Sequence, residues 1–220
     1  MHKSERICMI ALPVAAVLLL ALMVTGVFGG VETAAYGFAA SLHSPAMTAF
    51  MRVITELGGA IPVILLCLVL LIWPAARWRC GIPVSAAALL SVVLNQILKQ
   101  LVQRARPDVL RLSPAEGYSF PSGHSMNNAV VYLLLLFLLW PILQKAWQRA
   151  AAAIGFCLLP LLVGFSRMYL GVHYLGDILF GWLLGAWIAV LISVLWRRCG
   201  ERIHARAAAA WQRHVKKQKK

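Results

Sequence analysis

The stretch ILFGWLLGAWIAVLISVLW at residues 178–196 carries no charged side chain, and it is long enough to cross the hydrocarbon core of a membrane as one helix. Five similar apolar runs precede it, at about 7–28, 53–73, 82–98, 126–143 and 150–165. Across the 220 residues, 61% are hydrophobic and only 13% are charged, whereas a soluble domain carries about 25% charged residues. The sequence therefore predicts an all-α integral membrane bundle of six transmembrane helices, and it excludes a soluble globular or disordered chain.

The region around the first run has two features beyond its hydropathy. The run at 7–28 is longer than the apolar segment of a cleavable signal peptide, so we expect a retained first helix. Segment 29–51 is predicted to contain a short interfacial helix between the first two spans, with apolar anchors at Tyr36, Phe38, Leu42 and Phe50. Ser44-Pro45 has the form of an N-cap followed by proline, which indicates that the second helix begins there.

The basic residues are distributed unevenly about the predicted spans. With six spans, 15 of the 21 Lys and Arg residues fall on the side that holds both termini, and they account for most of the net charge of +14. The positive-inside rule therefore predicts cytoplasmic termini, and the compact chain is typical of a bacterial inner-membrane protein. We expect a membrane domain at 1–196 and a basic cytoplasmic tail at 197–220, which binds anionic lipid headgroups rather than nucleic acid.

Two residue types bear on packing and assembly. The five cysteines form no CxxC pair, so we expect packing residues rather than a disulfide framework or a zinc site. The Gly181-x-x-x-Gly185 pattern in the last span permits close helix contact. Packing within the bundle is the favoured interpretation and a dimer interface is the alternative, so the oligomeric state stays open.

The residues suited to chemistry gather in two loops, after the third and fifth spans. The first loop runs from Lys99 through Arg106 to a Pro-Ser-Gly-His turn at residues 121–124, and the second runs from Ser166 to Asp177. Both follow odd-numbered spans, so they lie on one membrane face whichever way the chain is inserted. The predicted orientation makes this the outer face.

Three cations, Lys99, Arg106 and Arg167, are expected at this mouth of the bundle, where an unpaired charge is costly. A multivalent anion would compensate them better than the few nearby carboxylates, and arginine suits tetrahedral oxyanions. Ser122 and Gly123 precede a predicted helix, so a hydroxyl and free backbone N–H groups can cradle phosphate oxygens. Together these residues predict a phosphate-binding site.

Two histidines supply the reactive groups in this prediction. His173 and Asp177 are four residues apart, so on a helix the carboxylate can orient the imidazole and leave its other nitrogen free to attack phosphorus. His124 can transfer a proton to the leaving oxygen. Few carboxylates are placed to bind Mg²⁺, so we expect phosphoryl transfer without a metal or other cofactor. Each motif alone also suits an ordinary turn, cap or hydrogen-bonded pair, and their combination indicates the site.

The three segments resemble the type 2 phosphatidic acid phosphatase (PAP2) family of membrane lipid phosphatases. The family pattern Lys-x6-Arg-Pro, Pro-Ser-Gly-His and Ser-Arg-x5-His-x3-Asp corresponds to segments 99–107, 121–124 and 166–177. The resemblance spans about residues 50–196 and implies an outward-facing site with a phosphohistidine intermediate. It implies His173 as nucleophile, Asp177 as its orienting residue and His124 as general acid. By the same resemblance, the phosphate ligands are Lys99, Arg106, Ser122, Gly123 and Arg167.

The function expected from this resemblance is hydrolysis of a lipid phosphomonoester or diphosphate at the outer membrane face. The candidate substrates are undecaprenyl diphosphate, phosphatidylglycerophosphate and phosphatidic acid, and the sequence does not choose among them. A lipid phosphotransferase that uses the same phosphohistidine is an alternative. A non-enzymatic anion-binding membrane protein is a more remote one.

Residues beside the motifs allow two interpretations. Glu56, near the outer end of the second span, is either a functional group paired with Arg104 or Arg106 or a member of a structural ion pair. Tyr118 and Phe120 border the predicted cradle, and we expect them to seat the loop rather than to contact the lipid chain.

Overall fold

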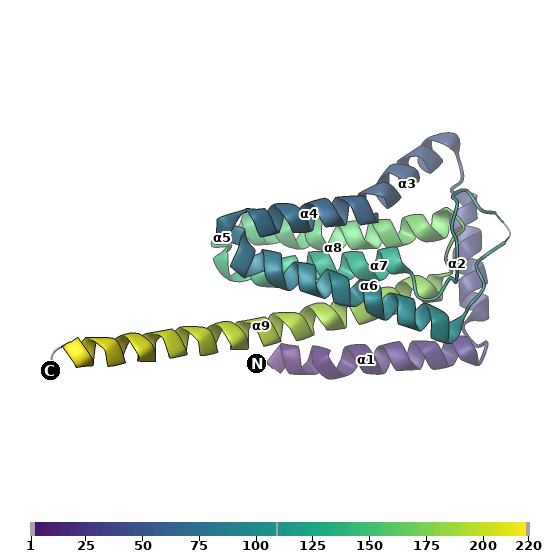
Figure 1. The fold of residues 1–220 in the computed structure, drawn as a ribbon. Helices are drawn as coiled ribbons and strands as arrows, with labels where there is room; N and C mark the ends of the chain where they lie inside the picture. Colours follow the sequence, from purple (N-terminus) through teal and green to yellow (C-terminus); the bar gives the residue numbers. More distant parts are fainter. Residues whose placement is uncertain (1–2, 109, 219–220) are drawn as a thin grey trace.

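Six long helical stretches run side by side as a bundle (Figure 1). The computed structural model describes the backbone of residues 3–108 and 110–218, with side chains to Gly200. No β-strand occurs in these ranges. The stretches that are long and apolar enough to cross a membrane are Lys3–Val24, Pro45–Ile72, Pro74–Val102, Gly123–Ile142, Ala146–Tyr169 and Leu175–Gly200. The predicted all-α architecture with six spans is confirmed.

Several spans contain a break or a short turn of another helix type. In chain order the elements are α1 (Lys3–Val24), α2 (Gly29–Ser41), α3 (Pro45–Leu57), α4 (Ala60–Ile72), α5 (Pro74–Ala76), the π-helical turn η1 (Arg77–Gly81), α6 (Ile82–Val102), α7 (Gly123–Leu139), the 3-10 turn η2 (Trp140–Ile142), α8 (Ala146–Tyr169) and α9 (Leu175–Gln218). The second span is divided at Gly58-Gly59, where α3 leans away from α4 (Figure 1).

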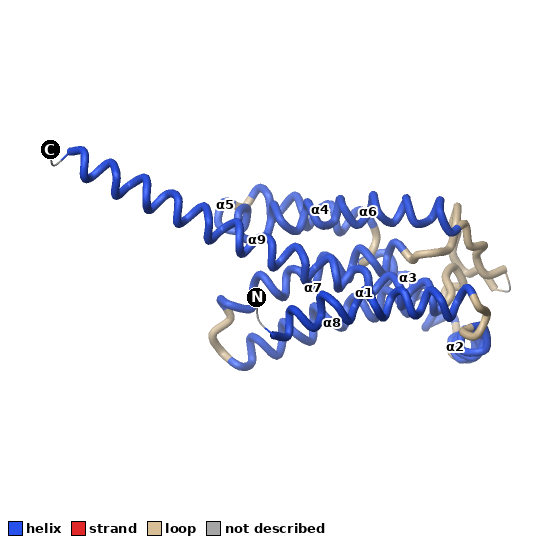
Figure 2. Tube along the Cα trace, turned by 90° about the horizontal axis from the view of Figure 1, so that it is seen from below, coloured by secondary structure: helices blue, strands red, loops and turns tan. Residues whose placement is uncertain are grey.

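The helix α2 lies across one end of the bundle, and both chain ends lie at the opposite end (Figures 1 and 2). The expected short helix between the first two spans is therefore present. Segment 29–51 is not one interfacial piece, however, because its last residues form the first turns of α3. The predicted helix start is confirmed, since the Ser44 hydroxyl accepts a hydrogen bond from the Met47 N–H at 3.2 Å.

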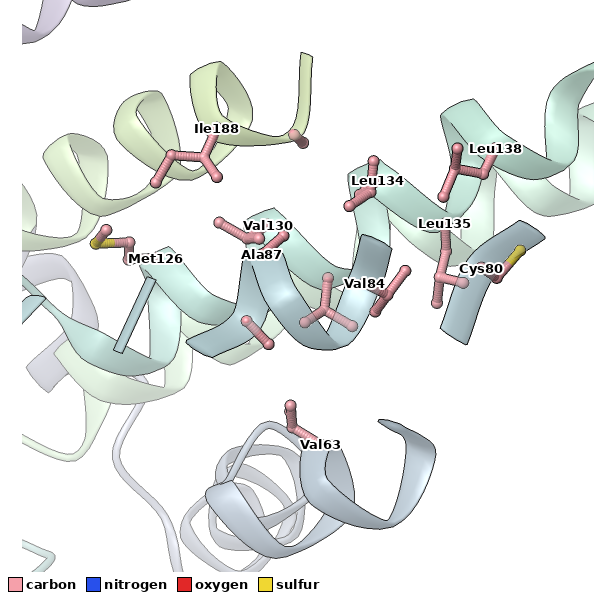
Figure 3. Packing of buried hydrophobic residues seen from close by; sticks show 13 residues of the cluster. Val63, Cys80, Val84, Ala87, Met126, Val130, Leu134, Leu135, Leu138 and Ile188 are labelled. Atoms are coloured by element: carbon pink, nitrogen blue, oxygen red, sulfur yellow. The ribbon is translucent and has the colours of Figure 1, made fainter. Parts of the chain in front are cut away.

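The helix α7 is the centre of the bundle and packs against α6, α8 and α9. Its buried side chains Val130 and Leu134 meet Val84 of α6 and Ile188 of α9 in the main hydrophobic core (Figure 3). The outer faces are apolar too, as Ile61, which is 72% exposed, illustrates on α4. Apolar residues on the inside and the outside are what a bundle immersed in lipid requires, because the lipid tails replace water as the surrounding solvent.

Two predicted spans are too short at the ends that carry the polar motifs. The helix α7 begins at Gly123 rather than near 126, and α9 begins at Leu175 rather than near 178. Their first turns hold Ser125 and Asp177, which are polar and yet fully buried, so a hydropathy pattern excludes them. At its other end α9 continues to Gln218 through the predicted tail. The division of the chain at residue 196 stays a prediction.

Two glycines bring α9 close to α7. A Cβ atom at Gly185 would lie 2.6 Å from the carbonyl oxygen of Met126 and 2.7 Å from the Cβ of Ala129. At Gly181 a Cβ would lie 3.0 Å from the carbonyl oxygen of Ser122. The close contact between these helices depends on the missing side chains, so the Gly-x-x-x-Gly pattern serves packing within one chain.

Replacing Gly185 by alanine is expected to destabilise the bundle, because the new methyl group forces α7 and α9 apart. Overpacking of this kind costs about 1–3 kcal/mol. Gly155→Ala on α8 is the matched control, since a Cβ there meets nothing within 4 Å. Thermal unfolding in detergent, followed by tryptophan fluorescence, should show a lower Tm for Gly185→Ala only. An equal Tm for the two variants would contradict this packing account.

Candidate active site

The polar motifs meet at the end of the bundle that α2 covers. Lys99 lies in the last turn of α6, Ser122 is the N-cap of α7, Arg167 lies in the last turn of α8, and Asp177 lies in the first turn of α9. The backbone N–H of Ser122 donates to the carbonyl oxygen of Asp177 at 3.1 Å, which joins the beginnings of α7 and α9. All eight residues expected in the site are thus carried by four helix ends and the segments between them.

Asp177 has no exposed surface although it carries a carboxylate. Its Oδ1 accepts a hydrogen bond from Arg104 at 2.7 Å, and its Oδ2 accepts from the Ser119 hydroxyl at 2.5 Å. The backbone N–H of Tyr174 donates to Oδ2 at 2.9 Å, so the carboxylate also caps the start of α9. The Nδ1 atom of His173 lies 3.6 Å from the same oxygen. The buried charge is therefore paired and hydrogen-bonded on both oxygens.

The neighbours of His173 define its tautomer. Ser119 uses its single proton on Asp177, so at 3.4 Å its oxygen can only accept from Nδ1 of His173. With the proton on Nδ1, Nε2 is the unprotonated nitrogen, and it accepts a hydrogen bond from a guanidinium nitrogen of Arg106 at 3.3 Å. The arrangement directs Nε2 toward the cationic side of the site.

His173 is only 2% exposed, and burial is the main cause that lowers its pKa to about 4. Asp177 acts in the opposite direction through hydrogen bonding and charge, whereas the positive charges of Arg167 and Arg106 add to the lowering of the pKa. The imidazole is therefore neutral at physiological pH. A neutral ring is the form that can attack phosphorus.

Two of the three expected phosphate-binding cations rest on backbone carbonyl groups. Arg106 donates to the carbonyl oxygens of Glu116, Gly117 and Val172 at 2.7, 3.0 and 2.8 Å. Lys99 donates through Nζ to the carbonyl oxygen of Tyr118. Carbonyl groups carry no net charge, so they hold these side chains without neutralising them.

The third cation, Arg167, is buried against α3. Its guanidinium donates to the hydroxyl of Thr55 at 2.8 Å, and its Nε has no hydrogen-bond partner. Among the described side chains, none of the three cations forms an ion pair with a carboxylate. The site is thus built with excess positive charge, which favours a multivalent anion.

The turn before α7 has the geometry of a helix cap. Ser122 is fully buried, and its hydroxyl oxygen accepts from the N–H and the hydroxyl of Ser125 at 3.4 and 2.9 Å. The Ser122 side chain therefore caps the start of α7, the kind of helix end at which backbone N–H groups can bind an anion. His124 follows on α7, within electrostatic range of Arg167, His173, Arg106 and Lys99. Its backbone carbonyl accepts from the Asn128 side chain at 2.8 Å, which steadies this turn.

Glu56 does not pair as predicted. Arg104 binds Glu32 and Asp177 instead, and Arg106 binds backbone carbonyls. The side chain of Glu56 is exposed and acts on Arg167 only through its charge. The prediction failed because α3 leans outward above Gly58, which turns this part of the second span away from the segment 103–108. Phe120 does seat its loop as expected, since it is fully buried and packs on Phe180 with ring centroids 4.6 Å apart.

Several residues of the site were not found from the sequence. Ser119 belongs to no motif, and Thr55 and Asn95 lie in otherwise apolar spans. The sequence predicts Arg104 only as a partner for Glu56, and it predicts no role for Glu32. For Thr55 and Asn95, the signal that the sequence offers is a polar residue inside a largely apolar helix. Within the described residues, no three His, Cys, Asp or Glu side chains lie together in a way that could hold a metal ion. The expectation of metal-independent chemistry stays a prediction.

Fold and site together define a multi-pass membrane protein with a buried histidine–aspartate pair facing a cluster of uncompensated cations. A family model for the PAP2 superfamily matches residues 81–201, more than half of the chain. The protein belongs to the PAP2 superfamily.

The chain is similar to several named membrane phosphatases. It is 40% identical over 104 residues to the phosphatidylglycerophosphatase B of Bacillus subtilis, covering 46% of this chain and 50% of that protein. It is 32% identical over 131 residues to an undecaprenyl-diphosphatase of Sulfolobus acidocaldarius, covering 56% and 57%. The matched segment thus spans about half the length of these curated relatives.

Two crystal structures share the fold. The transmembrane PAP2-type phosphatidylglycerolphosphate phosphatase from Bacillus subtilis superposes with a TM-score of 0.79 at 28% identity, covering 87% of this chain and 97% of that one. Aquifex aeolicus LpxE gives a TM-score of 0.57 at 26% identity, covering 72% and 92%. The arrangement of helices around the motifs is therefore shared with solved PAP2 phosphatases.

The depressed pKa of His173 predicts a pH-dependent stability. Between about pH 6.5 and pH 4 the unfolded chain binds a proton at this residue that the folded protein does not bind, so the free energy of unfolding falls as the pH falls. His173→Asn removes the titration. Its Tm in detergent should fall less than that of the wild type between pH 7 and pH 5. Parallel losses of Tm in the two proteins would contradict a neutral, buried His173.

Proposed function

We propose that this protein is a lipid phosphate phosphatase that works through a phosphohistidine on His173. The observation that carries the proposal is the unprotonated Nε2 atom of a neutral His173, which accepts a hydrogen bond from Arg106 at the cationic side of the site, while Asp177 lies behind Nδ1. The named activities of the relatives, which are phosphatidylglycerophosphatase, undecaprenyl-diphosphatase and lipid A phosphatase, support a lipid phosphate as the substrate class.

In the first step Nε2 of His173 attacks phosphorus and the bond to the leaving oxygen breaks. The imidazole becomes positively charged, and Asp177 stabilises this charge behind Nδ1. Lys99, Arg106 and Arg167 bind the equatorial oxygens, together with the hydroxyl of Ser122 and the backbone N–H of Gly123. The present oxygen partners of the three cations are backbone carbonyl oxygens and the Thr55 hydroxyl, which are weaker acceptors than a phosphate oxygen, so a phosphate can replace them.

His124 is the proposed general acid. The cations around His124 disfavour a proton on its imidazole. The negative charge of the incoming phosphate offsets them, so His124 can carry a proton while the substrate is bound. His124 gives its proton to the leaving oxygen and then accepts one from the water that attacks phospho-His173. Hydrolysis releases inorganic phosphate and restores both histidines. If an acceptor lipid replaced this water, the same site would act as a phosphotransferase.

The proposed substrate keeps its acyl or prenyl chain in the membrane while the phosphate enters the mouth of the bundle. Phosphatidylglycerophosphate is the first candidate, because the similar Bacillus subtilis sequence and the similar Bacillus subtilis structure are both named for it. Undecaprenyl diphosphate and phosphatidic acid are the comparison substrates. A head-to-head assay of phosphate release from the three lipids in detergent selects among them.

We further propose that the site opens on the outer face of a bacterial inner membrane and that both termini are cytoplasmic. The basic residues support this orientation, since those of the loops opposite the site lie at the same end as the termini. The expected lipid contacts of the basic tail fall mostly on residues 201–220, whose side chains lie outside those described, while Arg197 pairs with Glu5.

His173→Ala is expected to reduce phosphate release to the uncatalysed background, because the variant lacks the proposed attacking atom. His124→Ala should reduce release from a phosphomonoester by about 100- to 10,000-fold, the usual contribution of a general acid. His43→Ala is the matched control, since this histidine contacts Tyr169 rather than the site. Undiminished turnover in purified, folded His173→Ala protein would overturn the mechanism. Label transferred to a second lipid would favour the phosphotransferase.

The orientation is tested by cysteine labelling in intact cells, in a variant without native cysteines. Glu116→Cys lies in the exposed loop beside the site, and Trp147→Cys lies at the start of α8 at the other end of the bundle. A membrane-impermeant maleimide should label position 116 directly and position 147 only after permeabilisation. The reverse pattern would place the site in the cytoplasm.

A further inference from the structure

The helix α2 contributes one buried acidic residue to the surroundings of the site. Glu32 lies in the first turn of α2 and is only 9% exposed. Its two carboxylate oxygens accept hydrogen bonds from the guanidinium of Arg104 at 3.0 and 2.5 Å. Its Oε1 also accepts the backbone N–H of Gly176 at 3.1 Å. Glu32 therefore binds both an arginine and the first turn of α9.

Arg104 links this carboxylate to Asp177. One guanidinium nitrogen donates to Glu32 and also to Oδ1 of Asp177, the latter at 2.7 Å. The guanidinium also lies over the ring of Tyr174, 4.1 Å from its centroid. These partners raise the pKa of Arg104 despite its burial, through hydrogen bonds to Glu32 and the charges of both carboxylates. Arg104 is the one arginine of the site that is paired with carboxylates rather than with neutral groups.

The backbone is shaped to accommodate this contact. A Cβ atom at Gly176 would lie 2.6 Å from Oε1 of Glu32. Two further contacts fix α2 on the bundle: the Tyr36 hydroxyl donates to the carbonyl oxygen of Leu110 at 3.1 Å, and Ala39 is buried against Met168 and Ile178. Glu32 is thus held at a fixed place, as a positioning contact requires.

We propose that Glu32 and Arg104 are positioning residues, through which the docked helix α2 orients Asp177 toward His173. Arg104 holds Oδ1, which leaves Oδ2 for Ser119 and His173. Glu32 holds the guanidinium fork in plane and neutralises the charge that Arg104 would otherwise impose on the catalytic pair. The kinetic part of this proposal rests on the proposed phosphatase activity, and the geometric part does not.

The charge arrangement gives opposite expectations for two variants. The charged or titratable groups that face His173 are Asp177 from α9, Arg106 from the segment after α6, Arg167 from α8 and His124 from α7. Arg104 and Lys99 lie behind these groups, within electrostatic range of Asp177. Arg104→Gln removes a positive charge beside Asp177 and leaves its other neighbours in place, so the pKa of His173 should rise. Glu32→Gln leaves Arg104 without its neutralising partner, so the pKa of His173 should not rise.

Histidine-selective NMR titration of the full chain in detergent micelles measures this effect without substrate. We expect the pKa of His173 to rise by about one unit or more in Arg104→Gln. In Glu32→Gln, we expect the pKa of His173 to be equal to that of the wild type or lower. Glu5→Gln is the matched control, because it breaks the ion pair with Arg197 at the other end of the bundle. A His173 pKa that is equal in folded Arg104→Gln and wild-type protein overturns the proposal.

Kinetics test the geometric role with two milder variants. Arg104→Lys keeps the charge but loses the planar fork, and Glu32→Gln keeps the shape but loses the charge. Both should lower kcat by about 10- to 100-fold with little change in KM, whereas Glu5→Gln should keep wild-type values. Wild-type kcat in both variants would overturn the proposal even if Arg104→Gln did not fold. A wild-type protein that releases phosphate from none of the three lipids refutes the proposed function, and the titration still decides the coupling.

Discussion

The buried carboxylate of Asp177 is the constraint on which the rest of the site depends. A carboxylate with no exposed surface is tolerated only if its charge is paired and its oxygens are hydrogen-bonded. The chain meets this requirement from three separate segments, with Arg104 from the segment after α6, Ser119 from the loop before α7 and the Tyr174 N–H from the start of α9. Satisfying one charge therefore fixes the loops that carry the proposed catalytic groups.

The arginines and lysine of the site divide into two kinds by their partners. Arg104 is paired with Glu32 and Asp177, so its charge is already used within the protein. Lys99, Arg106 and Arg167 rest on carbonyl or hydroxyl oxygens, so their charge is available to a ligand. This division explains how one small mouth can hold a carboxylate firmly and still attract a phosphate. Both the proposed nucleophile and the proposed anion site follow from it.

The sequence predicted the parts of this architecture that depend on composition and spacing. Six apolar runs gave six spans, and His173 lies beside Asp177 as predicted. The helical reason for that pairing was wrong, because His173 lies in the bend before α9 and only Asp177 is on the helix. The close approach of Gly185 to α7 was also predicted, since small residues permit it whatever their neighbours. The contacts that the sequence did not predict are tertiary contacts between segments far apart in the chain. Nothing local to Glu32 indicates that it meets Arg104, 72 residues later, and the wrong pairing of Glu56 arose because the outward lean of α3 cannot be read from hydropathy.

The central claim is that His173 carries the phosphoryl group, and the most direct test is to find it there. Purified wild-type protein is mixed with a lipid phosphate, quenched under alkaline conditions within milliseconds, digested and analysed by mass spectrometry. The account predicts an acid-labile phosphate on the peptide that contains His173, and none on the corresponding peptide of His173→Ala protein. Phosphate on another residue, or turnover with no phosphorylated peptide under conditions that preserve phosphohistidine, would contradict it.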